Sequence, residues 1–130
     1  MLSFHKRADN KGSLVFLEGL KDIPFDIKRI YYIHGVDGSS RRGFHAHKEL
    51  HQVLICVHGS CKIMLDDGTY KADVTLNNPA EGLLVEGIFW REMYDFSSGA
   101  VLLVLASDYY DENDYIRDYN EFLQYVEARK

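Results

Sequence analysis

The sequence predicts an all-β protein, an antiparallel barrel or sandwich that ends in one short α-helix. Short β-rich runs recur along most of the chain, each bounded by Gly, Asn, Asp, Ser or Pro. Only the segment 111–130 changes from a strand pattern to a helical one. The 130 residues, 46% hydrophobic and 27% charged, are enough for one globular domain with a substantial core but too few for two. We therefore expect a single domain over residues 1–130.

Seven runs carry the strand pattern, and their close spacing favours hairpin connections. They are the segments 12–19, 27–35, 52–59, 61–68, 70–76, 81–87 and 100–108. Asp66, Asp67 and Gly68 stand between two of these runs, a composition typical of a tight hairpin turn. Hairpins join antiparallel neighbours, so the pattern supports either a barrel or a sandwich.

The C-terminal segment 111–130 has a different period. Its apolar residues at helical spacing are Tyr115, Tyr119, Phe122 and Val126. Acidic residues come first, as they do in the first turn of many helices. We expect one helix here, packed on the barrel through this aromatic face.

Charge and hydropathy exclude several classes of protein. A formal charge of −5 argues against non-specific nucleic-acid binding, which needs a basic face. No run reaches the roughly 18 apolar residues of a membrane span, and the N-terminus lacks the apolar core of a signal peptide. Cys56 and Cys61 flank a predicted turn, so a cross-strand disulfide is geometrically conceivable. Without an export signal we expect reduced thiols and a cytoplasmic location.

The most informative stretch is RGFHAHKELHQVLICVHG, residues 42–59. His45 and His47 stand two residues apart on a predicted strand, so both imidazoles point to the same face. Shortly after them the chain becomes apolar. Such a pair can be metal ligands, an acid–base site, or polar side chains buried for structural reasons.

The spacing His-x-His-x4-Gln-x6-Gly from His45 to Gly59 resembles the first signature of the cupin (jelly-roll) barrel, with one change. Metal-binding cupins carry a Glu where this chain has Gln52, and a further His ligand where it has Arg91. A guanidinium is always charged and never a ligand, so it would repel a divalent cation. With two of four ligands replaced, we expect no metal. His51 is the one further imidazole from which a third ligand could come.

Without a metal, two histidines that face a barrel interior are best suited to carry protons. Histidine ordinarily titrates near neutrality, and the ideal pKa of a catalytic acid or base lies near the operating pH. We therefore interpret His45 and His47 as an acid–base pair.

Four segments resemble the cupin family of nucleotide-sugar 3,4-ketoisomerases, which act on dTDP-4-keto-6-deoxyglucose. They are RRGFHAHK, LDDG, WREMYDFS and LASDYYDENDYIRDYNEF. The similarity covers nearly the whole chain. Its patterns R-G-x-H-A-H-K and D-Y-Y-D-x-x-D-Y-I-R-x-Y are much more specific than a His-x-His pair alone.

This resemblance implies a metal-independent isomerase that moves the sugar carbonyl from C4 to C3 through an enediol. The implied reaction requires no cofactor. The product, a dTDP-3-keto-6-deoxyhexose, would serve the synthesis of a 3-amino-3,6-dideoxyhexose for surface glycans such as lipopolysaccharide. His45 and His47 would transfer the protons. The family pattern also carries an essential tyrosine on the preceding strand, here Tyr31 or Tyr32. These two face opposite ways on a strand, and we favour Tyr31 as the catalytic one.

The resemblance also implies a set of substrate-binding residues. Arg42 and Arg29 are expected to bind the diphosphate, because a guanidinium forks onto phosphate oxygens. Tyr32 and Gln52 are further candidates for contact with the substrate. An aromatic ring should stack on the base, but the sequence does not identify it, and the nucleotide is either dTDP or UDP.

Lys11 and Arg91 bear on the stereochemistry of the product and complete the substrate-binding set. Family members leave either a galacto-type or a gluco-type configuration at C4. Lys11 stands where an Arg or an aromatic residue is often found, and Arg91 where other members have a His. Because an Arg is a poor proton donor, we predict the gluco-type product.

Three other functions stay open at this point. A nucleotide-4-ketosugar 3,5-epimerase is another metal-free barrel that uses a His base. A non-catalytic sugar-nucleotide-binding cupin would need the arginines but not His47 or the tyrosine. A metal-dependent cupin oxygenase would hold its ion through His45, His47 and His51. Open antiparallel edges and the resemblance together predict a homodimer in which N-terminal strands exchange or abut.

Overall fold

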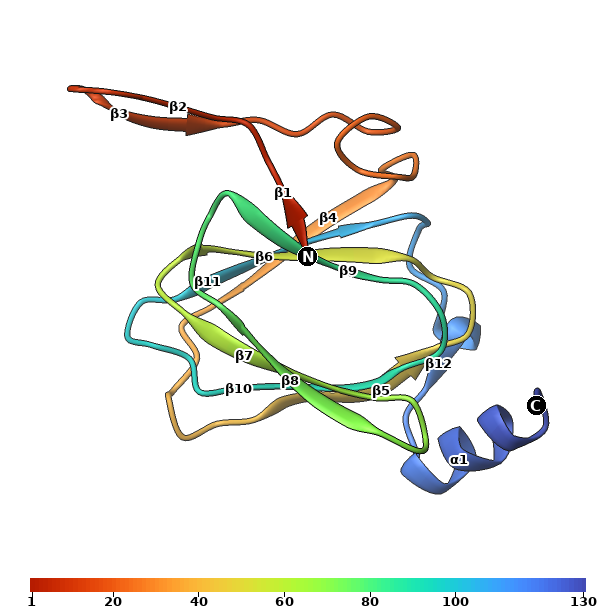
Figure 1. The fold of residues 1–130 in the computed structure, drawn as a ribbon. Helices are drawn as coiled ribbons and strands as arrows, with labels where there is room; N and C mark the ends of the chain where they lie inside the picture. The colour runs from red at the N-terminus through yellow and green to blue at the C-terminus, as the bar shows by residue number, and fades with distance from the viewer.

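Two five-stranded antiparallel sheets face each other in the computed structural model, which describes all of residues 1–130 (Figure 1). The first sheet has the order β1 (Leu2–Ser3), β9 (Glu81–Val85), β6 (Gln52–His58), β11 (Val101–Ala106) and β4 (Arg29–His34). The second has the order β12 (Tyr115–Ile116), β5 (Arg42–His47), β10 (Trp90–Tyr94), β7 (Cys61–Asp66) and β8 (Lys71–Leu76). This arrangement confirms the predicted all-β barrel.

All seven predicted strands are present, each with shorter bounds than the sequence pattern indicated. The predicted turn joins β7 to β8, where Oδ1 of Asp67 accepts hydrogen bonds from the backbone N–H of Thr69 at 2.8 Å and of Tyr70 at 2.7 Å. Gly68 in this turn has a φ of +97°. An Asp that satisfies the backbone, beside a Gly that tolerates positive φ, explains why the turn forms here.

The C-terminal helix is shorter than predicted. α1 covers Tyr119–Glu127, and its N-cap Asp118 accepts a backbone hydrogen bond at 3.0 Å. The preceding stretch forms a 3₁₀ turn at Glu112–Asp114 and then the strand β12, which pairs with β5. The helix prediction is therefore wrong over 111–118, because strand pairing and two capping aspartates override the helical periodicity. Neither α1 nor the 3₁₀ turn has the length and apolar composition that a membrane span requires.

Apolar side chains form three buried clusters. The largest lies between the two sheets, and its members include Leu54, Ile63 and Leu102. A second covers the outer face of the first sheet, where Phe25 from the N-terminal part packs. A third lies between the second sheet and α1, where Phe122 is fully buried. Apolar packing between the sheets thus stabilises the barrel, together with the N-terminal part and α1, which cover the outer faces of the two sheets.

Cys56 and Cys61 are unbonded thiols buried in the inner cluster, which agrees with the expectation of reduced cysteines. Burial raises the pKa of the Cys61 thiol to about 12. Both side chains therefore act as small apolar core residues.

The N-terminal hairpin of β2 (Lys6–Asp9) and β3 (Gly12–Val15) projects away from the barrel and pairs with neither sheet (Figure 1). Its residues are exposed almost throughout, including Leu14 at 57%. β1, which pairs with β9, attaches this end of the chain to the first sheet. The hairpin therefore has little contact with the rest of its own chain.

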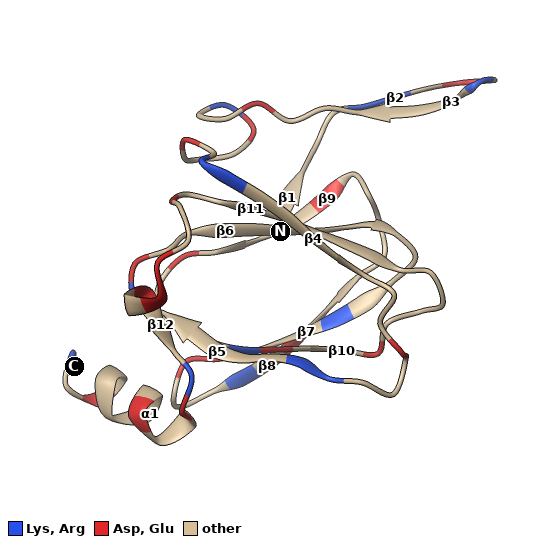
Figure 2. Cartoon of the chain, turned by 180° about the vertical axis from the view of Figure 1, so that it is seen from behind, with Lys and Arg blue, Asp and Glu red and all other residues tan.

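Opposite charges meet at one end of the barrel. Figure 2 shows acidic residues on the segment that leads into β12, which carries Asp108, Asp111, Glu112 and Asp114. Arg42 lies at the opposite end of β5 from His47. Arg29, at the start of β4, lies beside the acidic segment and lines one hollow with Asp108, Asp111 and Asp114. This end also holds the histidine pair.

Candidate active site

Polar side chains from four strands meet inside one end of the barrel. They are Arg29 and Tyr31 of β4, His45 and His47 of β5, Gln52 of β6 and Arg91 of β10. Arg91 is the register partner of His45, and hydrogen bonds link Arg91 to Gln52 and Gln52 to Tyr31. The structure thus brings together six of the residues that the sequence analysis selected.

The Arg-Gly-Phe-His-Ala-His stretch forms β5 with a local bulge. Gly43 has a φ of +95°, and a Cβ atom there would lie 2.8 Å from the carbonyl oxygen of Arg91 on β10. The register between the two strands shifts directly after Arg91. Past this shift His45 and His47 face inward, whereas Ala46 between them packs in the cluster beneath α1. The glycine lets the strands approach and so sets which side chains point into the barrel.

The two histidine rings form a compact group with Tyr115. The centroid of the His47 ring is 5.0 Å from that of His45 and 4.3 Å from that of Tyr115. The His45 and Tyr115 centroids are 5.2 Å apart. Tyr115 comes from β12, so the strand that replaces part of the predicted helix brings this ring to the site.

Both imidazoles are neutral at physiological pH. Burial, followed by the positive charge of Arg91, lowers the pKa of His45 to about 4 and that of His47 to about 2. A neutral imidazole keeps a free lone pair on one nitrogen. Each ring therefore has a lone pair that can accept a proton, but in the free protein it is a weaker base than an exposed imidazole.

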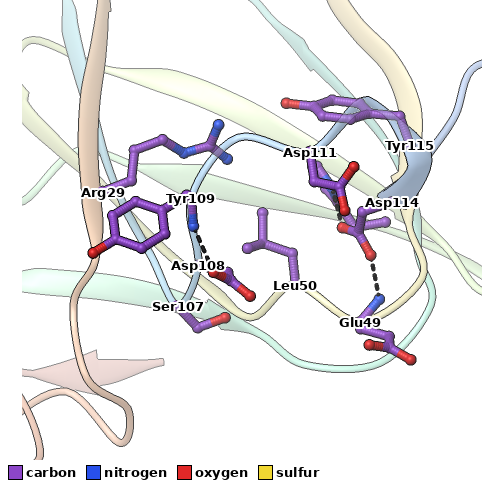
Figure 3. Close-up of a pocket in the computed structure, with 10 residues that line it drawn as sticks. Arg29, Glu49, Leu50, Ser107, Asp108, Tyr109, Asp111, Asp114 and Tyr115 are labelled. Carbon is purple, nitrogen blue, oxygen red and sulfur yellow. Dashed lines mark hydrogen bonds and ion pairs between the residues drawn. The ribbon is translucent and has the colours of Figure 1, made fainter.

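His47 is almost entirely buried, and its two ring nitrogens have different surroundings. Nδ1 lies 2.9 Å from Oδ2 of Asp114, while Nε2 is buried without a hydrogen-bond partner. Oδ1 of Asp114 accepts a hydrogen bond of 2.8 Å from the N–H of Glu49 (Figure 3). A hollow of about 190 Å³ adjoins this group, and its lining includes Arg29, Leu50 and several carboxylates (Figure 3).

Arg91 lies where a metal-binding cupin would carry a His ligand. Only 1% of it is exposed; it donates hydrogen bonds to Oε1 of Gln52 and, at 3.3 Å, to the carbonyl oxygen of Phe89. Burial lowers its pKa to about 10, which leaves the guanidinium charged at neutral pH. A fixed positive charge thus stands beside two neutral histidines.

The register of β4 separates the two candidate tyrosines. Tyr31 points inward, where its oxygen accepts a 3.1 Å hydrogen bond from Nε2 of Gln52, and burial raises its pKa. The hydroxyl hydrogen of Tyr31 is therefore free to be donated elsewhere. Tyr32 lies at the rim with 64% of its surface exposed, and its ring centroid is 6.0 Å from that of His34. Of the two, Tyr31 alone is in hydrogen-bond contact with the polar group.

Three arginines line the open side of the site, a hollow of about 460 Å³ that also includes Tyr31 and His45. They are Arg29, Arg42 and Arg117. Arg117 forms an ion pair of 2.7 Å with Glu112, and its guanidinium carbon lies 4.2 Å from the ring centroid of Tyr115. Guanidinium groups at the mouth of a polar hollow are suited to bind phosphate oxygens.

His51 lies apart from the histidine pair. Its Nδ1 is 3.3 Å from Oε2 of Glu86, and its ring meets that of Phe25 edge-on at 6.5 Å. No three His, Cys, Asp or Glu side chains of the chain converge in a way that could hold a metal ion. The structure therefore does not assemble the three imidazoles that the oxygenase alternative requires.

Lys11 was predicted to bind substrate, but within this chain it lies far from the site. Three residues that do lie at the site were not predicted. Lys11 lies in the turn of the projecting hairpin, far from the end of the barrel that holds β12 (Figure 1). Asp114, Tyr115 and Arg117 were not given roles. They all lie in the D-Y-Y-D-x-x-D-Y-I-R-x-Y pattern, so the signal was present, but a helix prediction obscured it.

The antiparallel barrel, with a histidine pair on its inner wall and arginines at its mouth, defines a cupin-type enzyme. A family model described as "FdtA: WxcM-like, C-terminal" matches residues 1–127. The chain belongs to this family, which confirms the resemblance seen in the sequence.

Individual relatives agree with this assignment. The TDP-4-oxo-6-deoxy-alpha-D-glucose-3,4-oxoisomerase of Aneurinibacillus thermoaerophilus is 55% identical over 126 residues, which cover 97% of this chain and 91% of that protein. A crystal structure of a mutant 3,4-ketoisomerase QdtA from Thermoanaerobacterium thermosaccharolyticum, in complex with TDP-4-keto-6-deoxyglucose, is similar with a TM-score of 0.96. Its identity is 51% over 98% of this chain and 93% of that chain. The WlaRB TDP-quinovose 3,4-ketoisomerase of Campylobacter jejuni gives a TM-score of 0.90 and 53% identity over 95% of both chains.

Proposed function

We propose that this protein is a metal-independent isomerase that converts a TDP-linked 4-keto-6-deoxyglucose into the corresponding 3-keto sugar. The observation that carries the proposal is the group of the buried His47 and the half-buried His45 and Tyr31 beside the charged Arg91. It offers proton carriers where related barrels place metal ligands. A relative with 55% identity is named for this reaction and this substrate. The donor set itself, with a guanidinium inside it, does not suit a cation.

The reaction consists of two proton shifts between neighbouring carbons. A base removes the proton from C3, which the adjacent ketone makes acidic, while the C4 oxygen takes up a proton to give an enediol. The C3 hydroxyl then loses its proton and C4 gains one, so the carbonyl ends at C3. Two groups that both accept and donate protons suffice, and the neutral His45 and His47 meet this requirement.

Tyr31 and Arg91 would stabilise the negative charge that develops on the sugar oxygens. The hydroxyl hydrogen of Tyr31 is free, since its oxygen accepts from Gln52. Preorganised donors to such an oxyanion contribute roughly 10²–10³-fold to the rate. Arg91 adds a positive charge that Gln52 holds in place.

The arginines at the mouth would bind the diphosphate. Arg42 and Arg29 were expected in this role, and Arg117 joins them around the same hollow. The negative diphosphate would also offset the charge of these arginines, which favours protonation of the histidines once substrate is bound. Binding would thus help to ready the pair for proton transfer.

We further propose the gluco-type configuration at C4 of the product. Arg91 lies inside the barrel where a His could protonate one face of C4, and an Arg is a poor proton donor. The WlaRB enzyme, named for TDP-quinovose, is 53% identical to this chain. A 3-keto product with this configuration is suited to an amination reaction at C3, as the synthesis of a 3-amino-3,6-dideoxyhexose requires. A galacto-type C4 proton in the NMR spectrum of the product would contradict this.

We also propose a homodimer built through the N-terminal hairpin, and a cytoplasmic location remains a prediction. The hairpin that carries Lys11 and the exposed Leu14 has little to pack against in its own chain. Lys11 can approach a substrate only if the hairpin reaches the barrel of a second copy. Sedimentation equilibrium tests the dimer, and Leu14→Glu should weaken it.

The main proposal is tested by incubating the enzyme with dTDP-4-keto-6-deoxyglucose in D₂O and recording proton NMR spectra. We expect a new C3 carbonyl and deuterium at C4. Deuterium at C3 and C5 with the carbonyl still at C4 would indicate the 3,5-epimerase instead. Binding of the nucleotide sugar without any exchange would indicate a non-catalytic binding protein.

A further inference from the structure

The His47 ring is oriented by a single strong contact. Its Nδ1 lies 2.9 Å from Oδ2 of Asp114, its Nε2 has no partner, and only 1% of the residue is exposed. An ionised carboxylate can only accept hydrogen bonds, so Nδ1 must carry the ring hydrogen. The lone pair of the neutral ring is then on Nε2.

Asp114 is itself held by the two residues that directly follow His47 and the strand β5. Its Oδ1 accepts a 2.8 Å hydrogen bond from the N–H of Glu49 (Figure 3), and its backbone carbonyl accepts a 2.9 Å hydrogen bond from the N–H of Lys48. These contacts continue the pairing of β12 with β5. The distance between Asp114 and His47 is therefore fixed by backbone structure.

The neighbouring acidic residues have other partners. Asp111 caps the 3₁₀ turn by accepting from the N–H of Asn113 at 3.0 Å, and Glu112 pairs with Arg117. Asp114 is the carboxylate of the turn that contacts His47.

We propose that Asp114 is a positioning residue that holds His47 in the tautomer with a free Nε2, ready to take a proton from the sugar. The proposal rests on the proposed isomerase function. When a proton moves from the substrate carbon to Nε2, the resulting imidazolium donates its Nδ1–H to a negative carboxylate. The proton on Nε2 exchanges with solvent, and the ring then delivers a proton to the neighbouring carbon. The ring so regains its starting tautomer, and protons taken up and given back balance. This gives the acidic turn before β12 a role in the reaction.

The test is the variant Asp114→Asn, which keeps the size of the side chain. The N–H of Glu49 needs an oxygen acceptor, so the amide must turn its Nδ2 towards His47. That Nδ2 donates to Nδ1, and the ring hydrogen must move to Nε2, where it blocks proton uptake. We expect kcat to fall by about 10²–10⁴-fold, in the range of a positioned acid–base group, with KM within about threefold.

Nitrogen-15 NMR of histidine-labelled protein measures the tautomer of the His47 ring. If Asp114 only stabilised the fold, its replacement by Asn would not change this tautomer. The Nδ1–H tautomer of His47 is expected in the free wild-type protein and the Nε2–H tautomer in the Asp114→Asn variant. Asp118→Asn is the matched control, because Asp118 caps α1 four residues further along, lines no part of the site, and Asn also caps well. It should leave both kcat and the ring spectrum unchanged.

Two results would overturn the proposal. One is the Nε2–H tautomer of His47 in the wild-type protein. The other is the Nε2–H tautomer in the Asp114→Asn variant together with an unchanged kcat. The first needs no variant, so it decides the matter even if Asp114→Asn fails to fold. Failure of the proposed function is distinguishable, because it would appear as a wild-type protein that does not isomerise the sugar. The ring spectrum of the free protein would still be measurable in that case.

Discussion

The two ends of the barrel are built from the same strands but from different kinds of side chain. At one end β6 contributes Leu54 to an apolar cluster with Ile63 and Leu102. At the other end the same strand contributes Gln52, which bonds to the buried Arg91. The apolar end gains free energy from burial, whereas the polar end requires a hydrogen bond or a partner for nearly every group it buries.

The difference indicates which end serves stability and which serves chemistry. Burying the guanidinium of Arg91 and the imidazole of His47 is unfavourable unless each is satisfied, yet Nε of Arg91 and Nε2 of His47 lack partners. Unsatisfied buried groups of this kind are retained where a ligand completes them. We therefore expect changes at the polar end to affect turnover and changes at the apolar end to affect folding.

The largest expected effect is that of His47→Asn, which should abolish turnover. The Asn can still donate a hydrogen bond to Asp114, so the fold and the affinity for TDP should change little. Turnover of dTDP-4-keto-6-deoxyglucose and calorimetric titration with TDP measure the two quantities. His51→Asn is the control, because His51 lies apart and pairs with Glu86. If His47→Asn retains activity, the polar end is not the catalytic end.

Leu102→Ala should have the converse effect. Leu102 is fully buried in the inner cluster, and truncation of such a side chain typically costs about 2–5 kcal/mol of unfolding free energy. Urea denaturation measures this cost, and kcat at 25 °C should stay within about twofold. Val57→Ala, at a position that is 40% exposed, should cost under about 1 kcal/mol. A large fall in kcat for Leu102→Ala would show that the two ends are coupled.

The unfolding free energy should decrease as the pH is lowered from 7.5 to 5.0, and His45 and His47 of the polar end should contribute to this decrease. The pKa of His45 is lowered to about 4 and that of His47 to about 2, both below the ordinary value of 6.5, so the unfolded chain binds more protons in between. The stability linked to these rings is complete above about pH 6.5 and is lost progressively as the pH falls below it. Thermal unfolding at pH 7.5, 6.0 and 5.0 should show a falling midpoint. The His47→Asn variant should show a shallower fall, and an equal slope would count against the buried neutral ring.

The smallest expected effect is that of Arg42→Ala. Arg42 is an exposed residue at the mouth, where diphosphate attraction acts on substrate and transition state alike. KM should rise about tenfold with kcat nearly unchanged, and added salt should reduce the difference. Arg41→Ala is the matched control, since Arg41 is paired with Glu92. An unchanged KM would remove Arg42 from the diphosphate site.

Much of the barrel could be predicted because its signals are local. Alternating apolar residues, and turns such as Asp67-Gly68, are read from a few neighbouring residues. The histidine pair was predictable for the same reason, since the period of a strand puts His45 and His47 on one face. The replacement of metal ligands by Gln52 and Arg91 also needed only the spacing of a known signature.

The C-terminal segment shows where local reasoning ends. The spacing of Tyr115, Tyr119 and Phe122 is helical, but Tyr115 pairs with His47 across β12 and β5, more than sixty residues away in the chain. That pairing competes with helix formation and wins because it buries Ile116 and satisfies backbone groups of both strands. The placement of Asp114 on His47 follows from the same pairing.

By itself, the sequence determined most of the strands, the β7–β8 turn, the histidine pair and the replacement of two metal-ligand residues. Each of these depends on periodicity or on residue identity at a fixed spacing. Only the tertiary structure decided that Tyr31 rather than Tyr32 contacts the polar group, that Asp114 and Tyr115 belong to it, and that Lys11 lies apart. These depend on register and on contacts between distant segments, which no local pattern encodes.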